Sequence, residues 1–199
     1  MENIKQSPGI LFVISGPAGS GKTTLCDRIT NEMSLKRVIT CTSREPRGTE
    51  INGVDYHFYN KEKFKELINN NAFFEYAIVH NNYYGTLESE VIEPLKMGNN
   101  MILNIDVQGT KNIKKQSNEC PLLKDRIFTI FIVPPNLEEL KNRLKNRGTN
   151  SKEEINKRLE VAKKEIQEQH LYDYTITSAS KNEDFNNVAS FINRINKNQ

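Results

Sequence analysis

The sequence contains no tryptophan and has little aromatic content. Phe and Tyr together make up 8% of its 199 residues, so we expect a core packed mainly from aliphatic side chains. Only three cysteines occur, Cys26, Cys41 and Cys120, and no two of them form a CxxC pair. This spacing excludes a disulfide or zinc framework and predicts reduced thiols of a cytoplasmic protein.

Long apolar segments are also missing. The longest apolar run near the start is Ile10–Ile14, whereas a membrane helix needs about 20 residues. Met1–Gly9 has neither a basic start nor an apolar stretch, so we expect no signal peptide. The net charge is only +3, from 28 basic and 25 acidic residues, and it does not require a nucleic-acid partner. We therefore expect that the protein neither inserts into a membrane nor binds nucleic acid. Small anions remain suitable ligands.

Short apolar runs alternate with helical patterns along much of the chain. Four runs are typical of strands buried in a parallel sheet: Ile10–Ile14, Met101–Ile105, Ile127–Val133 and Tyr174–Thr177. Helical patterns cover Lys22–Met33, Leu87–Met97, Leu137–Arg147, Ser151–His170 and Glu183–Asn196. This alternation predicts an α/β fold with a three-layer αβα core and a right-handed, doubly wound parallel sheet.

The stretch from Arg37 to Thr86 has a different character. Aromatic-rich strands are indicated at Tyr56–Tyr59 and Phe73–Val79, and Asn81-Asn82 could turn the chain into a further strand. This pattern predicts a small mixed α/β insertion. The sequence contains no internal repeat. No linker is long enough to separate two independent domains.

Gly16–Thr23 matches the phosphate-binding pattern GxxxxGK[ST]. The motif follows the first buried strand and opens a helix, which is the context it requires. Glycines let backbone N–H groups wrap a phosphate at the positive end of the helix. We expect Lys22 to reach the β- and γ-phosphates and the Thr23 hydroxyl to ligate Mg²⁺. The expected nucleotide-binding residues are Gly16, Pro17, Ala18, Gly19, Ser20, Gly21, Lys22, Thr23 and Thr24. The bland alternative is a glycine-rich turn with a surface lysine.

Two arginines, Arg44 and Arg47, lie three residues apart around Pro46. Two guanidinium groups on one loop can form forks for phosphate oxygens. Taken alone, they could equally be two solvated surface arginines.

Further motifs follow in a fixed order. They are Thr42–Glu50, Gly53–Phe58, Phe73–Tyr76, Asn82–Thr86, Ile105–Gly109 and Arg143–Gly148. Together with the phosphate loop, the sequence resembles the guanylate kinase family from about Gly9 to the C-terminal helix. The resemblance implies transfer of the γ-phosphoryl group of ATP to GMP, and to dGMP, giving ADP and GDP. It also implies a single domain over residues 1–199, with a core (1–36, 98–136 and 168–199), a GMP-binding subdomain (37–90) and a helical lid (137–167).

The resemblance assigns the GMP phosphate to Arg44, Arg47, Tyr56 and Tyr84, and guanine to Thr40, Glu75, Thr86 and Asp106. The chemistry of guanine agrees, because its N1–H and N2–H₂ donors suit a carboxylate such as Glu75. Adenine has no donor at N1 and would leave this carboxylate unpaired. The hydroxyls of Thr40 and Thr86 would donate to O6 of guanine. The alternatives are a solvent-facing Glu75 on an edge strand and ordinary packing of Tyr56 and Tyr84.

Three arginines mark the expected lid. Arg143 and Arg147 are four residues apart and share a helical face, while Arg158 borders the apolar stripe of the next helix. The resemblance implies that Arg147 and Arg158 contact the transferring phosphates and that Arg143 lies against adenine or the polyphosphate. The expected catalytic residues are thus Lys22, Arg44, Arg147 and Arg158. An arginine lying along the apolar surface with its charged end in water is the alternative for Arg158.

Two positions depart from the family pattern. Asn104 stands where an acid is usual, and Thr177–Ser180 replaces a Val-Asn-Asp-Asp segment near the adenine site. Our hypothesis is that Mg²⁺, the expected cofactor, relies on Thr23, phosphates and water, with help from Asp106.

Two other functions remain open from sequence. One is a kinase for another nucleoside monophosphate or a phosphosugar on the same scaffold. The other is a non-catalytic guanylate-kinase-like module that binds phosphoproteins. In every case we expect a cytoplasmic monomer or homodimer.

Overall fold

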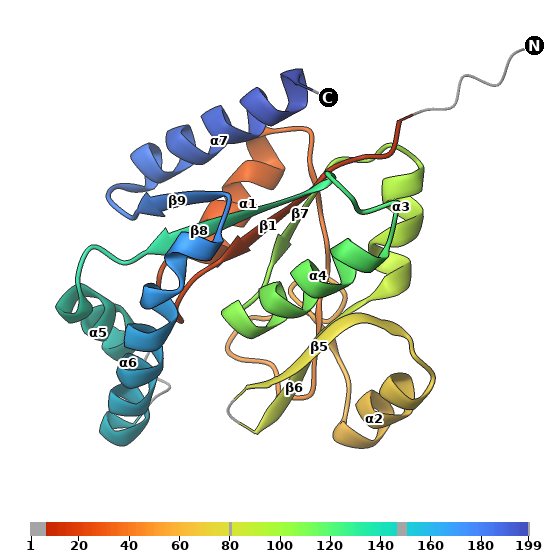
Figure 1. The fold of residues 1–199 in the computed structure, drawn as a ribbon. Coiled ribbons are helices and arrows are strands. Elements are labelled where there is room, and N and C mark those ends of the chain that lie inside the picture. Colours follow the sequence, from red (N-terminus) through yellow and green to blue (C-terminus); the bar gives the residue numbers. More distant parts are fainter. Residues whose placement is uncertain (1–6, 80, 147–150, 199) are drawn as a thin grey trace, which may run out of the picture. The chain divides into compact units, whose positions relative to one another are not determined.

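The structure is a computed structural model that describes residues 7–79, 81–146 and 151–198. Its strands are β1 (Leu11–Ser15), β2 (Lys36–Arg37), β3 (Cys41–Thr42), β4 (His57–Phe58), β5 (Phe73–Val79), β6 (Asn82–Leu87), β7 (Met101–Asn104), β8 (Ile127–Val133) and β9 (Tyr174–Thr177). Its helices are α1 (Lys22–Glu32), α2 (Lys61–Asn69), α3 (Ile92–Lys96), α4 (Val107–Glu119), α5 (Leu137–Asn146), α6 (Lys152–Gln167) and α7 (Lys181–Lys197). Short 3₁₀ turns lie at Glu88–Glu90 and Gln169–Leu171. Figure 1 shows the path of the chain with most helices and strands labelled.

The strands form two sheets, with orders β2-β7-β1-β8-β9 and β4-β3-β6-β5. Pairs β2–β7 and β8–β9 of the first sheet are parallel, which confirms the expected α/β class with a parallel sheet. The second sheet is mixed, because β3 pairs in parallel with β4 and antiparallel with β6. The mixed sheet expected between Arg37 and Thr86 is therefore present.

The chain divides into two compact units. The first contains the residues up to Leu11, Lys36–Leu103 and Gln108–Ile127, and the second contains Phe12–Leu35, Asn104–Val107 and the residues from Phe128 onward. Each unit is described by itself.

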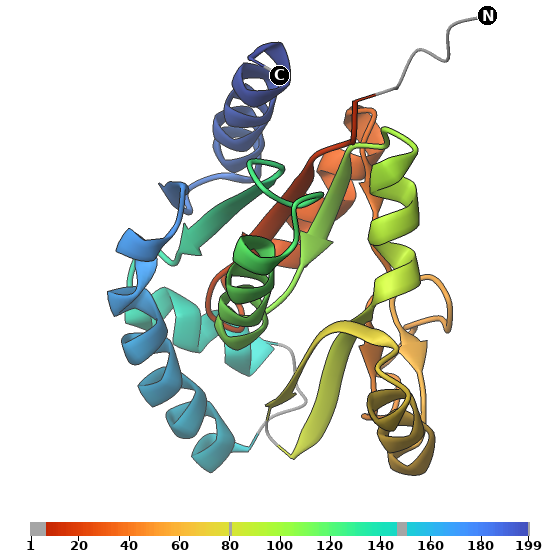
Figure 2. The same ribbon diagram turned by 45° about the vertical axis from the view of Figure 1, so that its right-hand side comes forward.

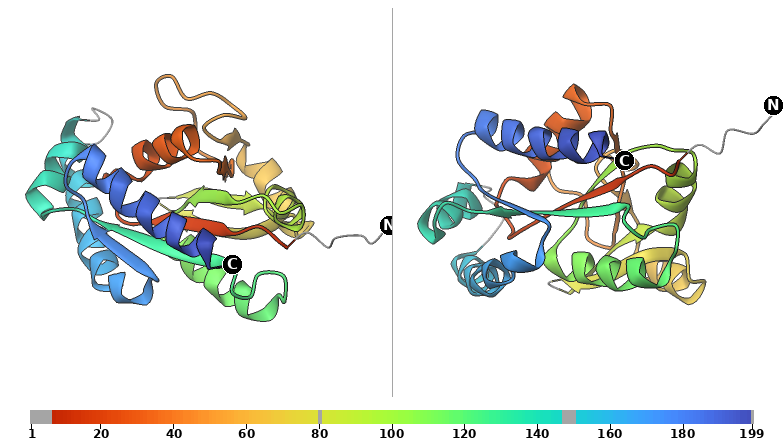
Figure 3. Two further views of the ribbon diagram at one scale, coloured as in Figure 1. Left: turned by 90° about the horizontal axis from the view of Figure 1, so that it is seen from above. Right: turned by 45° about the horizontal axis from the view of Figure 1, so that its top comes forward.

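In the second unit, β1 from Phe12 onward and β8 from Phe128 onward supply the apolar centre. All five residues of β1 are buried, as are Ile130, Phe131 and Ile132 of β8. Helices α1 and α7 lie side by side (Figures 1 and 3). The guanidinium of Arg28 on α1 bonds Asn182 and lies over the Phe185 ring of α7. The pair of helices α5 and α6 (Figure 2) shares a buried cluster of Leu140, Leu144, Ile155 and Ala162.

In the first unit, β5 and β6 form a hairpin. Asn81 lies at its turn with a φ of 65°, and Asn tolerates this left-handed conformation better than most residues. The ring of Phe64 on α2 stacks on Phe73 at 4.5 Å and on Tyr83 at 5.3 Å between ring centroids. Helix α2 is thereby fixed to the hairpin.

Several helix boundaries follow their capping residues. Ser151 with Glu154 and Ser180 with Glu183 form complete capping boxes at α6 and α7. Asn136 accepts a bond from the backbone N–H of Glu139 at the start of α5. The expected helix starts after Asn136 and at Ser151 are confirmed, while α7 begins two residues before the expected Glu183.

The helix expected over Leu87–Met97 is present only in part, and its expected start was wrong. Strand β6 continues through Leu87, a 3₁₀ turn follows, and α3 covers only Ile92–Lys96. Helices α2 and α4 and the short strands β2 and β3 were not expected from the sequence. Among the described residues, no helix combines the length and apolar character needed to cross a bilayer.

Candidate functional site

The phosphate loop joins β1 to α1 within the second unit. Gly16, Gly19 and Gly21 all have positive φ angles, of 141°, 93° and 104°. A Cβ atom at Gly16 would lie 2.5 Å from the backbone oxygen of Ile132, and one at Gly19 would lie 3.1 Å from the side chain of Leu140. The loop therefore needs glycine both for its backbone conformation and for its close packing.

Polar groups inside this loop suit an anion. The Lys22 ammonium donates to the backbone oxygens of Gly16 at 2.7 Å and Pro17 at 3.0 Å. Ser20 is fully buried, and its hydroxyl has no hydrogen-bond partner among the residues that the structure describes. A buried hydroxyl without a partner is costly, and a phosphate oxygen at the loop would satisfy it. Pro17 and Ala18 complete the loop, and Ala18 packs against the cluster between α5 and α6.

Thr23 and Asn104 form the candidate metal region. The amide of Asn104 donates to the Thr23 hydroxyl at 3.2 Å, and Asp106 follows two residues after Asn104 in the same unit. No group of three or more His, Cys, Asp or Glu side chains within the described ranges could hold a metal. Mg²⁺ commonly keeps several waters and uses one or two protein oxygens plus substrate phosphates. Thr23 and its neighbours fit that mode of binding.

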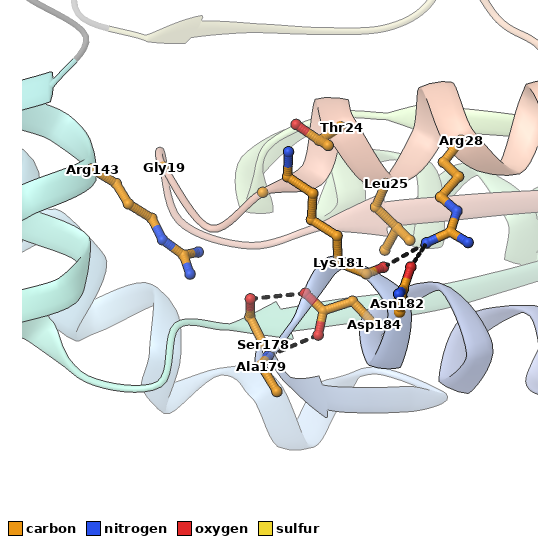
Figure 4. A pocket seen from close by; sticks show the side chains of 11 residues that line it. Gly19, Thr24, Leu25, Arg28, Arg143, Ser178, Ala179, Lys181, Asn182 and Asp184 are labelled. Carbon is orange, nitrogen blue, oxygen red and sulfur yellow. Dashed lines mark hydrogen bonds between the residues drawn. The ribbon is translucent and has the colours of Figure 1, made fainter.

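A cavity of about 470 Å³ lies beside the phosphate loop in the second unit. Its lining includes Gly19, Thr24, Arg143, Ser178, Lys181 and Asn182 (Figure 4). This volume suits a small-molecule group such as a nucleobase. Both carboxylate oxygens of Asp184 at its rim already accept bonds, from the Ser178 hydroxyl at 2.9 Å and the Ala179 N–H at 2.8 Å.

The three lid arginines have different outcomes. Arg143 lines the cavity, and its Nε donates to Glu139 Oε1 at 2.9 Å. Arg158 is half-buried on α6 of the same unit. Arg147 lies outside the described residues, so its expected role stays a prediction.

In the first unit, Arg44 and Glu50 form a forked ion pair. Arg44 Nη1 lies 2.6 Å from Glu50 Oε2, and Nη2 lies 2.7 Å from Oε1. Arg44 is buried, and its Nε has no hydrogen-bond partner within the described part of the chain. Glu50 also accepts from the backbone N–H of Arg47 at 2.8 Å. Burial opposes ionisation of Glu50, but the hydrogen bonds from Arg44 and from the backbone of Arg47, together with the charges of both arginines, lower its pKa.

Two phenols lie next to this pair. The Arg44 guanidinium is 5.0 Å from the centre of the Tyr56 ring, and the rings of Tyr56 and Tyr84 meet edge-on at 6.4 Å. Burial raises the pKa of Tyr56, so its hydroxyl stays a neutral donor at physiological pH. Arg47, by contrast, is exposed. The first unit thus brings Arg44, Tyr56 and Tyr84 together, with Arg47 on the same loop.

A buried carboxylate lies in the same unit. Glu75 on β5 is only 5% exposed, and it pairs in register with Thr86 on β6. The Thr86 hydroxyl donates to Glu75 Oε1 at 2.8 Å. Burial first, and then the charges of Glu90 and Glu75, raise the pKa of Cys41 to about 12, so this thiol stays neutral. Thr40, the residue before Cys41, is also buried.

These contacts sharpen the sequence-based roles. A solvent-facing Glu75 is excluded by its burial. A hydroxyl has one proton, so Thr86 can donate to O6 of a base only by giving up its bond to Glu75. Asp106, which the resemblance assigns to guanine together with Thr40, Glu75 and Thr86, belongs to the second unit. Its expected role in guanine binding therefore stays a prediction.

Sequence reasoning missed Glu50, Arg28 and Asn182. Glu50 stood inside a motif without a role, although an acid near two arginines was a usable signal. Arg28 and Asn182 carry no motif, and only the packing of α1 on α7 brings them to the cavity.

The family model for guanylate kinase matches residues 9–195 of the chain. A guanylate kinase of Clostridioides difficile is 44% identical over 169 residues, which cover 84% of this chain and 79% of that protein. A guanylate kinase of Fusobacterium nucleatum is 42% identical over 186 residues, covering 94% and 97%. The crystal structure of guanylate kinase from Anaplasma phagocytophilum matches with a TM-score of 0.77 and 26% identity, covering 94% of this chain and 86% of that one.

Proposed function

Because this chain belongs to the guanylate kinase family, we propose that it transfers the γ-phosphoryl group of ATP to GMP, and to dGMP, giving ADP and GDP. The observation that carries the choice of acceptor is the buried Glu75 carboxylate, held by Thr86 in the same unit as Arg44. Such a carboxylate can accept both N1–H and N2–H₂ of guanine. An adenine in its place would leave the buried charge unpaired.

In this proposal the second unit binds ATP. Backbone N–H groups of Gly16 and Ala18–Thr24 hold the β- and γ-phosphates, and a phosphate oxygen accepts the hydrogen bond of the Ser20 hydroxyl. Lys22 shifts from the loop carbonyls to the phosphates and stabilises charge on the bridging oxygen. Thr23 would hold Mg²⁺ through its hydroxyl oxygen, and the ion would supply neutralisation of phosphate charge. The cavity lined by Arg143 receives adenine.

The first unit binds GMP. Arg44 and Arg47 neutralise the phosphate, and the phenols of Tyr56 and Tyr84 donate to its oxygens without adding charge. While Glu50 and the Glu45 carbonyl accept from the two Nη atoms of Arg44, its buried Nε–H and the second N–H of Nη2 are the donors left for phosphate oxygens. Thr40, Glu75 and Thr86 bind guanine, and Asp106 is proposed to assist from the second unit.

The reaction needs no covalent enzyme intermediate. A phosphate oxygen of GMP attacks the γ-phosphorus of ATP in line, and the bond to the β,γ-bridging oxygen breaks to release ADP. Lys22, Arg44, Arg147 and Arg158 are proposed to stabilise the charge that develops. Closure of residues 137–167 as a lid would exclude water, the competing acceptor.

We also propose that residues 37–90 act as the GMP-binding subdomain, with 1–36, 98–136 and 168–199 as the core. The protein would work in the cytoplasm as a monomer or homodimer.

The test is a coupled assay that follows ADP formation from ATP with and without GMP. We expect GMP-dependent ADP formation that requires Mg²⁺ and is lost in Lys22→Ala. The exposed Lys36→Ala serves as a control that should keep full activity. Absence of GMP-dependent transfer by the wild-type protein would refute the proposal.

A further inference from the structure

The cavity beside the phosphate loop is bounded on one side by the start of α7 (Figure 4). Lys181 and Asn182 are the first two residues of this helix, and the capping box of Ser180 with Glu183 fixes its first turn. Side chains that leave this turn are therefore held in defined positions relative to the cavity.

Arg28 on α1, which also lines the cavity, fixes that turn. Its Nη1 donates to the backbone oxygen of Lys181 at 3.1 Å and to Asn182 Oδ1 at 2.7 Å. Its Nε pairs with Glu32 at 2.6 Å, and its guanidinium lies 4.2 Å from the centre of the Phe185 ring. Arg28 thus contacts one backbone oxygen, one amide oxygen, one carboxylate and one aromatic ring. Its guanidinium therefore has little freedom to rotate.

These contacts determine which way the amide of Asn182 points. A guanidinium has only donors, so the amide atom that faces Arg28 must be the oxygen. The NH₂ group is then the branch that remains for another partner, and it has none among the described residues. Arg28 thus makes Asn182 a hydrogen-bond donor at the wall of the cavity.

We propose that Asn182, oriented by Arg28, donates a hydrogen bond to the nucleobase of the phosphoryl donor. This inference rests on the proposed function of the cavity as the ATP base site. Purines carry acceptor nitrogens on their ring edges, including N7. Asn182 is accordingly a base-contacting residue, and Arg28 is a positioning residue that acts through it.

The variant Asn182→Asp separates this role from a merely structural one. Aspartate keeps an acceptor for Arg28, so every structural bond survives, but it has no proton to offer the base. We expect this variant to bind the Mg²⁺ complex of a non-hydrolysable ATP analogue about tenfold more weakly by calorimetry. Its affinity for GMP should not change. Unchanged binding of the analogue would overturn the proposal.

Two controls make the result specific. Inorganic triphosphate has no base, so its affinity should be equal in Asn182→Asp and the wild type; a loss as large as that of the analogue would contradict base recognition. Asn186→Asp adds the same charge one turn later on α7, at an exposed position outside the cavity, and should bind the analogue normally. Equal weakening in this control would likewise overturn the proposal.

The positioning role of Arg28 is tested in the same way. We expect Arg28→Ala to raise KM for ATP several-fold with kcat and KM for GMP nearly unchanged, and Arg28→Lys to recover only part of the loss. The matched control is Arg194→Ala, which removes a guanidinium that lies over the Phe191 ring on α7. This variant should leave KM for ATP unchanged. Because binding of the analogue needs no turnover, the calorimetric comparison of Asn182→Asp with the wild type remains decisive even if the protein fails to phosphorylate GMP.

Discussion

Replacing Glu75 by glutamine removes the negative charge from the proposed guanine site while keeping the size of the side chain. Glu75 is 5% exposed, and its Oε1 already accepts from Thr86 at 2.8 Å. A glutamine can keep that bond through its carbonyl oxygen. Its NH₂ group would then face the N–H donors of guanine.

The expected loss follows from these bonds. A hydrogen bond to a charged group contributes about 1.5–3 kcal/mol, and a neutral one about 0.5–1.5 kcal/mol. Exchanging two charged bonds for one neutral bond and a facing pair of donors should cost about 2–4 kcal/mol. This energy corresponds to a roughly 30- to 700-fold fall in kcat/KM for GMP.

The assay compares GMP with IMP, which lacks the 2-amino group. Wild-type protein should prefer GMP over IMP by about 10- to 100-fold, and Glu75→Gln should reduce that preference to a few-fold. KM for ATP should stay within about twofold of the wild-type value. Glu88→Gln removes an exposed carboxylate of the same unit and should leave all values unchanged. A Glu75→Gln protein that keeps the wild-type GMP/IMP ratio would refute the assignment of Glu75 to guanine.

Three further predictions concern other contacts. Because Arg44 lowers the pKa of Glu50 below 4.5, their pair should add stability above pH 4.5 and lose it as the pH falls below that value; acid titration of Glu50→Gln should show a smaller loss than wild type. Asn104→Asp places a negative charge beside Thr23, so half-maximal activity should require several-fold less Mg²⁺; an unchanged Mg²⁺ dependence would show that this position is neutral. Gly19→Ala adds a methyl group at a φ of 93°, 3.1 Å from Leu140, and should cost about 1–2 kcal/mol of stability, or about 2–8 °C in Tm by calorimetry; an unchanged Tm would contradict the packing described for the loop.

Motifs with a backbone requirement were predictable from the sequence. The phosphate loop follows a buried strand and opens a helix because glycines at positive φ are the simplest means of making that turn. The helix starts after Asn136 and at Ser151 were predictable for the same reason, since each capping side chain bonds the backbone within one turn. These features depend on interactions between residues that are close in the sequence.

Elements that depend on distant partners were not predictable. Helix α2 has an Asn60 cap but only one buried residue, Phe64, which stacks on Phe73 and Tyr83 of the hairpin. The apolar pattern before Met97 suggested a helix from Leu87, yet pairing of Leu87 with Phe73 keeps it in β6. In both cases tertiary contacts decided the local structure.

The site shows the same division. Arg44, Tyr56, Glu75 and Tyr84 were assigned from motifs, and the structure brings them into one unit with the carboxylate buried. The bonds among them were not predictable, because the pairing of Arg44 with Glu50 and of Thr86 with Glu75 depends on how the loop and the hairpin fold.

The most direct test of the account is the rate of ADP formation with GMP compared with AMP at equal concentration. Glu75 should pair with the donor edge of guanine and be left unpaired by adenine. The account predicts kcat/KM for GMP at least about 100-fold above that for AMP. Comparable turnover of the two monophosphates would contradict it.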